Sequence, residues 1–221
     1  MYPNPNDITR LTLANGLTVL VRENHAAPVA VLHGSLAVGA MQETPEQAGL
    51  ASLVAAMLSR GSRGYSFDAF NAAVENVGGN LTFSADTHST SFGLVCLPED
   101  FADLVAVLAD ALRQPLLAED HIGKVRRRQL VELQERDEDT ASVANLRFYE
   151  TLFGRQHPYG RSTSGYRETV ETLARADLQR FYDDYYTPDQ GVIVVTGDVQ
   201  TQAVLHLLAA TLGDWYGPAA D

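Results

Sequence analysis

The sequence predicts an α+β fold in which helices pack on one face of a mainly antiparallel sheet. Three observations lead to this prediction. Short alternating apolar runs occur in pairs joined by turn residues, which is typical of antiparallel hairpins. Longer segments repeat apolar residues every three to four positions, as amphipathic helices do. The segments follow the order hairpin, strand, helices, hairpin, helices, strand, helix, which differs from the regular alternation of a parallel α/β fold.

The first strands lie near the N-terminus. Two alternating runs flank Asn15-Gly16, a dipeptide that favours a tight hairpin turn, and they cover residues 8–13 and 17–21. A third strand is expected over residues 29–38, where Gly34 indicates a bulge or a close neighbour. His33 lies in the same apolar run, so we expect a buried histidine with satisfied hydrogen bonds.

Capping residues mark the next elements. A helix is expected to start with Thr44 as its N-cap and Pro45 at its first position, and to run to about Arg60 before Gly61. Ser66 caps a second expected helix that ends at Gly78-Gly79. A second hairpin then covers residues 80–85 and 89–97.

The second half of the chain is mainly helical. Expected helices cover residues 101–114, 118–138, 140–152, 174–186 and 201–212, with a short apolar strand at 191–196. Trp215-Tyr216-Gly217-Pro218 resembles an exit into a linker. No interior segment has the composition of a linker, so we predict a single domain over residues 1–221.

Composition restricts the partners. The formal net charge of −12 disfavours binding to nucleic acid and to anionic membranes. The longest apolar runs are too short to span a bilayer, and the first ten residues contain two prolines and no apolar core. We therefore expect a cytoplasmic protein, although a removed leader is left open. Cys96 is the only cysteine, which excludes an internal disulfide.

The polar residues form no motif of known chemistry by themselves. No two of the six histidines have the i, i+4 spacing of a zinc-binding helix. The carboxylates of LVELQERDED are explained by a solvated helix face that Arg126, Arg127 and Arg128 balance. No P-loop and no G-x-S-x-G elbow occurs. Residue chemistry alone therefore predicts only a soluble α+β domain.

Several stretches, taken in chain order, resemble the first half of the insulinase/pitrilysin-type zinc peptidases, the inverzincins. They are LANGLTVLVREN, VGAMQETPEQAGLASLVAAMLSRGS, GGNLTFSADTHSTSFGLVCL, FYETLFGRQHPYGRSTSG and YYTPDQGVIVVTGDV. Together they cover nearly all of the chain, and their order is more specific than any one of them. The resemblance implies the half-domain fold of that family. It also implies that residues 215–221 lead into a second domain, so the chain is expected to be the first half of a longer subunit.

The resemblance places the family's H-x-x-E-H motif in GLASLVAAMLSRGS. The two motif histidines fall on Ser52 and Ala56, and the motif glutamate falls on Ala55. In active relatives the histidines and a later glutamate hold zinc, while the motif glutamate activates water. The later glutamate falls on Glu132, 76 residues after Ala56. Because one carboxylate cannot hold zinc at useful affinity, we expect no catalytic residue and no zinc, with Glu132 as a relic ligand position.

A second departure from the family pattern lies on the expected edge strand. Active relatives carry a small Asn-Ala pair beside the metal, and the matching residues here are Thr82 and Phe83. Relatives bind substrate as an added strand on a sheet edge. The corresponding peptide-binding candidates in this chain are Asn80, Leu81, Thr82, Phe83 and Ser84.

Three functions follow from the resemblance. The first is a pseudo-peptidase that pairs with a chain or domain carrying an intact zinc motif, as in two-chain relatives where a degenerate subunit completes the chamber. The second is a stand-alone module that binds unfolded peptides along a sheet edge. The third is a zinc endopeptidase with rearranged ligands. A homo-oligomer is also left open, whereas nucleic acid and membranes are not expected partners. An unrelated α+β domain is disfavoured by the number of matching segments.

Overall fold

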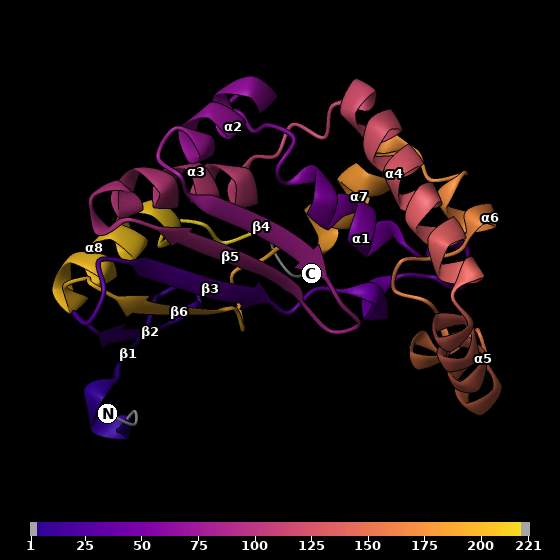
Figure 1. Cartoon of the computed structure of the whole chain (residues 1–221), viewed down its shortest axis with the longest axis horizontal. Helices are drawn as coiled ribbons and strands as arrows, with labels where there is room; N and C mark the ends of the chain where they lie inside the picture. The colour runs from indigo at the N-terminus through magenta and orange to yellow at the C-terminus, as the bar shows by residue number, and fades with distance from the viewer. Residues whose placement is uncertain (1–3, 218–221) are drawn as a thin grey trace.

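A six-stranded sheet forms the centre of the molecule (Figure 1). The computed structural model describes residues 4–217. The strands, in chain order, are β1 (Thr9–Thr12), β2 (Thr18–Glu23), β3 (Ala30–Leu36), β4 (Asn80–Ala85), β5 (Thr90–Cys96) and β6 (Val192–Gly197). Their spatial order is β1-β2-β6-β3-β5-β4, with β2 and β6 parallel and all other neighbouring pairs antiparallel. The predicted fold class is confirmed.

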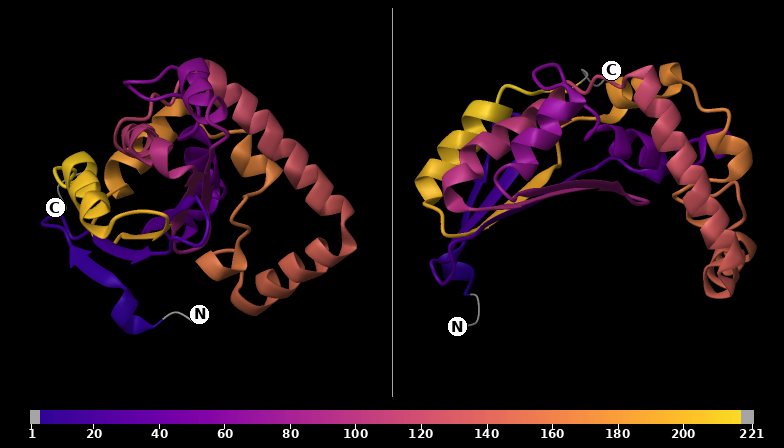
Figure 2. Two further views of the ribbon diagram at one scale, coloured as in Figure 1. Left: turned by 60° about the vertical axis from the view of Figure 1, so that its left-hand side comes forward. Right: turned by 45° about the horizontal axis from the view of Figure 1, so that its top comes forward.

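Helices cover one face of this sheet. The α-helices of the chain are α1 (Leu50–Met57), α2 (Phe67–Glu75), α3 (Phe101–Arg113), α4 (Glu119–Glu138), α5 (Thr140–Phe153), α6 (Arg167–Val170), α7 (Arg175–Tyr185) and α8 (Thr201–Leu212). Figure 2 shows α2, α3 and α8 over one face, while no helix within residues 4–217 covers the opposite face. Helices α4 and α5 extend beyond the end of the sheet at which β4 turns into β5, which gives the molecule the shape of an arch (Figures 1 and 2).

Burial along the strands follows from this one-sided cover. Strand β3 alternates between buried and more accessible residues, and β5 and β6 do the same. The buried strand residues include Leu32, Phe92 and Ile193, and they share one core with Leu108 of α3 and Leu208 of α8. Each such side chain contributes about 1.5–3 kcal/mol to folding when fully buried. The prediction for His33 is wrong, because its side chain lies on the face without helices and is exposed.

Two glycine predictions can be checked directly. Gly16 follows Asn15 at the first turn with φ +87°, and β1 and β2 pair as the predicted hairpin. The Asn15 side chain is buried and donates from Nδ2 to the carbonyls of Leu212 at 2.6 Å and Trp215 at 2.8 Å. A Cβ at Gly34 would overlap the ring of Phe92, so the predicted close neighbour is confirmed.

The predicted helix from Thr44 to Arg60 is wrong in its extent. The structure has a 3₁₀ turn at Pro45–Gln47 and then α1 at Leu50–Met57. Gly49 between them has φ +97°, a left-handed conformation that an α-helix cannot contain. Thr44 precedes the 3₁₀ turn but makes no capping hydrogen bond through its side chain.

The other predicted elements occur within a few residues of their expected ends. Ser66 caps α2 by accepting a hydrogen bond from the backbone N–H of Ala69. The short helix α6 was not predicted. Within the described part of the chain, no helix combines the length and the apolar character that a membrane span requires. Of the predicted exit segment, residues 218–221 lie outside the described residues.

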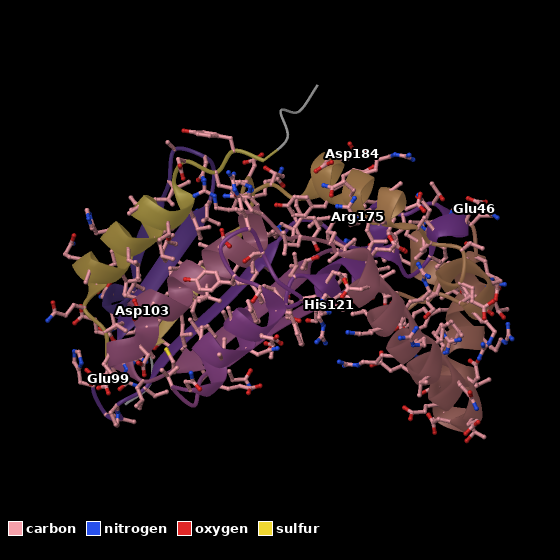
Figure 3. All side chains as sticks on the ribbon, turned by 90° about the horizontal axis from the view of Figure 1, so that it is seen from above. Glu46, Glu99, Asp103, His121, Arg175 and Asp184 are labelled. Carbon is pink, nitrogen blue, oxygen red and sulfur yellow. The ribbon has the colours of Figure 1, made fainter. Side chains whose placement is uncertain are left out.

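Acidic side chains are spread over the outside of the helix layer. Figure 3 labels Glu46, Glu99, Asp103 and Asp184 on this side, and all four are exposed. They come from different parts of the chain, so the net charge of −12 is distributed and not confined to one segment.

Candidate functional site

A small pocket lies where α1, β4 and α4 meet. Its volume is about 180 Å³. Eleven residues from these elements, from the turn after α1 and from one nearby loop line it: Ser52, Ala56, Arg60, Phe83, Ser84, Ala85, Val125, Arg128, Gln129, Glu132 and Ser164. The structure thus brings together Ser52, Ala56 and Glu132, which were singled out from the sequence. Phe83 and Ser84, from the predicted peptide-binding strand, line the same pocket.

Helical geometry explains the contribution of α1. Residues at positions i and i+4 lie on one face of a helix, so Ser52 and Ala56 both face the pocket. Ala55 is fully buried and does not line the pocket. The remaining apolar residues of α1, among them Leu53, Val54 and Met57, are buried in the core. The helix therefore presents one narrow face to the pocket and packs on its other sides.

A buried carboxylate holds the start of α1. The Glu43 oxygens accept hydrogen bonds from the backbone N–H of Gly49 at 3.2 Å and of Ala51 at 2.7 Å. These N–H groups have no partner within the helix, because a helix leaves its first donors unpaired. Burial raises the pKa of Glu43 to about 7, although both hydrogen bonds and the nearby Arg161 favour the charged form.

A second buried side chain connects α1 to α4 and to the loop around Ser164. Gln129, on α4, donates from Nε2 to the carbonyl of Gly49 at 3.1 Å and to the carbonyl of Ser164 at 2.9 Å. Thr169 donates to the carbonyl of Ala48. Three segments distant in sequence are thus joined by hydrogen bonds at one wall of the pocket, which makes its shape a property of the fold.

The positions expected from the zinc motif have other partners. Ser52 donates from Oγ to the carbonyl of Thr163 at 2.9 Å, and Ala56 offers only a methyl group. Glu132 Oε1 accepts a hydrogen bond from Arg128 Nε at 2.8 Å, and the Glu132 side chain is 51% exposed. A catalytic zinc needs about three protein ligands of the imidazole, thiolate or carboxylate type. One ion-paired carboxylate does not supply that set, so these residues do not fit a zinc ion.

No other described residues offer such a set. Within residues 4–217, no group of three or more His, Cys, Asp or Glu side chains lies close enough to hold a metal. The absence of zinc stays a prediction, since only metal analysis of the protein can test it.

Strand β4 forms one edge of the sheet. It pairs with β5 on one side, and no strand of the described chain pairs with its other side. Leu81, Phe83 and Ala85 are half-buried and pack against the core, whereas Asn80 and Thr82 are exposed. The face of Phe83, which sequence alone did not reveal, is therefore the helix side. Asn80, Leu81 and Thr82 lie further along the strand and do not line the pocket.

Two arginines were missed from sequence. Arg60 follows α1, and its guanidinium carbon lies 5.2 Å from the centre of the Phe67 ring. Burial, and then the neighbouring charge of Arg128, lower the pKa of Arg60. A helical repeat gives a signal for both, because Arg60 is four residues after Ala56 and Arg128 is four residues before Glu132. Their meeting across two helices requires the fold.

Two family models match this chain. The model described as insulinase (peptidase family M16) matches residues 18–166, and the model described as peptidase M16 inactive domain matches residues 172–220. In the structure, β6 lies between β2 and β3, so both matched segments build one sheet.

Curated relatives are similar over most of this chain. A probable mitochondrial-processing peptidase subunit beta of Arabidopsis thaliana is 28% identical over 195 residues, which are 88% of this chain and 36% of the relative. An uncharacterized zinc protease of Mycobacterium tuberculosis is 31% identical over 208 residues, which are 92% of this chain and 46% of the relative. The chain thus spans less than half the length of these relatives.

Solved structures share the fold. A protease from Helicobacter pylori matches with a TM-score of 0.89 and 21% identity, over 97% of this chain and 52% of that one. A peptidase M16 inactive domain from Pseudomonas fluorescens matches with a TM-score of 0.87 and 22% identity, over the same shares of the two chains. At this identity the likeness concerns the fold alone.

Proposed function

Because the chain belongs to the insulinase family, peptidase family M16, we propose that it is a non-catalytic member that handles peptides together with a zinc-motif subunit or domain. One observation carries this proposal. The pocket that gathers Ser52, Ala56 and Glu132 holds one ion-paired carboxylate and no imidazole. This set does not match the ligands of a catalytic zinc, and Ala55 stands where the family's general base would be.

The pairing part of the proposal has separate support. One matched family model carries the description of an inactive domain, and relatives named as subunit beta of a processing peptidase are similar to this chain. The sheet also exposes one face without helices, including the apolar residues Val95 and Val194. An exposed apolar sheet face is a typical surface for burial against a partner.

The test is reconstitution. The chain is co-expressed with a family member of the same genome that carries an intact zinc motif, and the complex is purified through a tag on the chain. We expect a defined complex that cleaves a quenched fluorescent peptide, with one zinc per complex, and activity that disappears when the partner's motif glutamate is changed to glutamine. If the chain alone contains stoichiometric zinc, which is lost in Glu132→Ala, then the proposal is wrong and a rearranged zinc site is right.

A second function is favoured by the position of β4. An extended peptide can add to a free sheet edge through main-chain hydrogen bonds without any metal. The free side of β4 lies beside the pocket, and the candidate residues are Asn80, Leu81, Thr82, Phe83 and Ser84. Titrating an unstructured peptide into isotope-labelled protein should shift the amide signals of residues 79–85. Unchanged signals in this segment at saturating peptide would remove the idea.

A further inference from the structure

The charged side chains of the pocket are mainly cationic. Arg60 and Arg128 line it together with one carboxylate, Glu132. The local sum is one positive charge, in a protein whose formal net charge is −12. Two neighbouring guanidinium groups repel each other and gain from an anion between them.

Arg60 is the less satisfied of the two arginines. Its Nε is buried and has no hydrogen-bond partner among residues 4–217. Its guanidinium lies over Phe67, whose ring is 4.8 Å from the ring of His121 (labelled in Figure 3). The aromatic contact orients the guanidinium, and its buried Nε–H donor is left without a partner among the described residues. A partly buried cation with unpaired donors is costly unless an anion binds to it.

Arg128 is only partly occupied by its neighbour. Glu132 accepts a hydrogen bond from the Nε of Arg128. The two terminal nitrogens of Arg128 make no hydrogen bond to a described residue. A guanidinium has five N–H donors and binds a carboxylate with two of them. Arg128 can therefore retain Glu132 and bind a second carboxylate at the same time.

Size limits the anion. A volume of about 180 Å³ is below the roughly 300 Å³ at which pockets for drug-sized ligands begin. A nucleotide does not fit, whereas a carboxylate with a short side chain does. Phe83, Ser84 and Ala85 line the same pocket, so a chain that lies along β4 reaches it directly.

We propose that this pocket binds the C-terminal carboxylate of an extended peptide that lies along the free edge of β4, with Arg60 and Arg128 as the donors. The inference rests on peptide binding to β4, as proposed above, and adds that the edge selects free chain ends. The hydroxyl of Ser52 donates to Thr163 and retains a lone pair that can accept from ordered water at the carboxylate. Products of proteolysis, which carry new C-termini, have the chemistry that this site would take.

The experiment compares one unstructured, dye-labelled peptide with a free C-terminus against the same peptide as a C-terminal amide, by fluorescence anisotropy with the full chain. We expect the acid to bind about tenfold or more tightly than the amide, since charge-assisted hydrogen bonds are about twice as strong as neutral ones. The ratio should fall as salt is added. A third peptide, amidated but ending in Asp, distinguishes a terminal carboxylate from a side-chain one.

Substitutions locate the effect. Arg128→Gln should remove most of the preference for the acid, and Arg60→Met should do the same while keeping an apolar contact with Phe67. Arg60→Lys keeps the charge and should keep part of the preference for the acid. If Arg60→Met loses binding and Arg60→Lys retains it, the loss is due to the missing charge and not to a folding defect. Arg127→Gln is the matched control, because Arg127 is on the same helix but does not line the pocket. Glu132→Gln should strengthen acid binding several-fold, since it removes the competing carboxylate.

The outcomes separate the two proposals. Equal binding of acid and amide, both lost when β4 is altered, would overturn the carboxylate site and leave the strand-binding function in place. Equal binding of the acid and of the Asp-ending amide would show that the pocket takes any carboxylate, and the selection of free chain ends would be wrong. Absence of binding for all three peptides would contradict both proposals.

Discussion

Glu43 is a carboxylate that the protein encloses at the start of α1, the helix that carries Ser52 and Ala56. It accepts two backbone hydrogen bonds and lies near Arg161, which donates to its carbonyl at 2.8 Å. These contacts favour the charged form, but burial outweighs them and raises the pKa of Glu43 to about 7 from 4.5. Its proton is thus exchanged near neutral pH, at the point where α1 is attached to the rest of the site.

This raised pKa predicts a pH-dependent stability. Because the folded value lies above the unfolded value, the folded state binds the proton more tightly. Protonated Glu43 therefore stabilises the folded state fully below pH 4.5, and this contribution is lost as pH rises through about 7. At 1.36 kcal/mol per pKa unit, the free energy of unfolding falls by about 3 kcal/mol in total. Glu43→Gln has no proton to lose, so its unfolding free energy in urea should vary less between pH 5 and 8. Curves for the two proteins that run parallel over this range would contradict the prediction.

Substituting alanine at two glycines, Gly34 and Gly123, should change the unfolding free energy in opposite directions. A methyl group at Gly34 would overlap the buried ring of Phe92, whereas at Gly123, inside α4, the nearest atom is Arg127 Nη1 at 3.8 Å. We expect Gly34→Ala to lower the unfolding free energy by about 1–3 kcal/mol, as overpacking does. Gly123→Ala should raise it by about 0.5–1 kcal/mol, because alanine favours the helix. Denaturant titration measures both, and a stable Gly34→Ala would show that β3 and β5 are less closely packed than the structure indicates.

Among the α-helices of the described residues, α5 is the one that buries none of its residues in the core. Its apolar side chains Phe148, Tyr149, Leu152 and Phe153 are 41–60% exposed. The helix contacts α4 and the short turn Pro158–Gly160, and it projects beyond the sheet (Figure 2). An apolar surface of this kind on a projecting helix is typical of an interaction surface.

A double substitution tests this role. Phe148→Ser with Leu152→Ser should change the unfolding free energy by about 1 kcal/mol or less, since exposed side chains contribute little to folding. The same variant should weaken recovery of the zinc-motif partner in the co-purification described above. Leu108→Ala is the contrasting variant, because Leu108 is fully buried and its truncation should cost about 2–5 kcal/mol. Partner recovery at the wild-type level would exclude α5 from the interface.

Elements could be predicted from sequence where their signals are local. Asn15-Gly16 predicted a hairpin and Ser66 predicted a helix start, since a turn or a cap depends on neighbouring residues. The break at Gly49 was missed, because the apolar spacing continues across it and its partners Glu43 and Gln129 lie on other segments. His33 was expected in the core because it lies in an apolar strand. The alternation along β3 shows that the strand has two faces, but it does not show that helices leave one of these faces uncovered.

The site shows the same division. The register of a family motif located Ser52, Ala56 and Glu132, and the structure brings all three to one pocket. The chemical character of that pocket depends on Arg60 and Arg128, which approach each other only because α1 packs against α4. No local pattern in the sequence contains that contact. A pocket can thus be located from sequence while its charge has to be read from the fold.

On the scale of the whole molecule, the pocket has a frame that does not depend on a metal. Gln129 binds the carbonyls of Gly49 and Ser164, and Glu43 binds the start of α1. These contacts fix where α1 presents positions 52 and 56 and where α4 presents Glu132. None of the three positions takes part in the contacts. The fold should therefore accept zinc ligands at these positions without a change in its architecture.

Substitutions that introduce zinc-binding side chains at positions 52 and 56 test this expectation. Ser52→His and Ala56→His supply two imidazoles one helical turn apart, and Arg128→Gln releases Glu132 from its ion pair. We expect this triple variant to hold about one zinc per chain after dialysis, to melt at a higher temperature with zinc, and to lose the metal when Glu132→Ala is added. Wild type should hold less than a stoichiometric amount. Val131→His with Glu135→His is the matched control, since both residues are exposed on α4 at the same spacing and do not line the pocket. Peptidase activity should not appear, because no general base is introduced. Zinc retention no better than in the control would mean that positions 52, 56 and 132 do not converge as the structure has them.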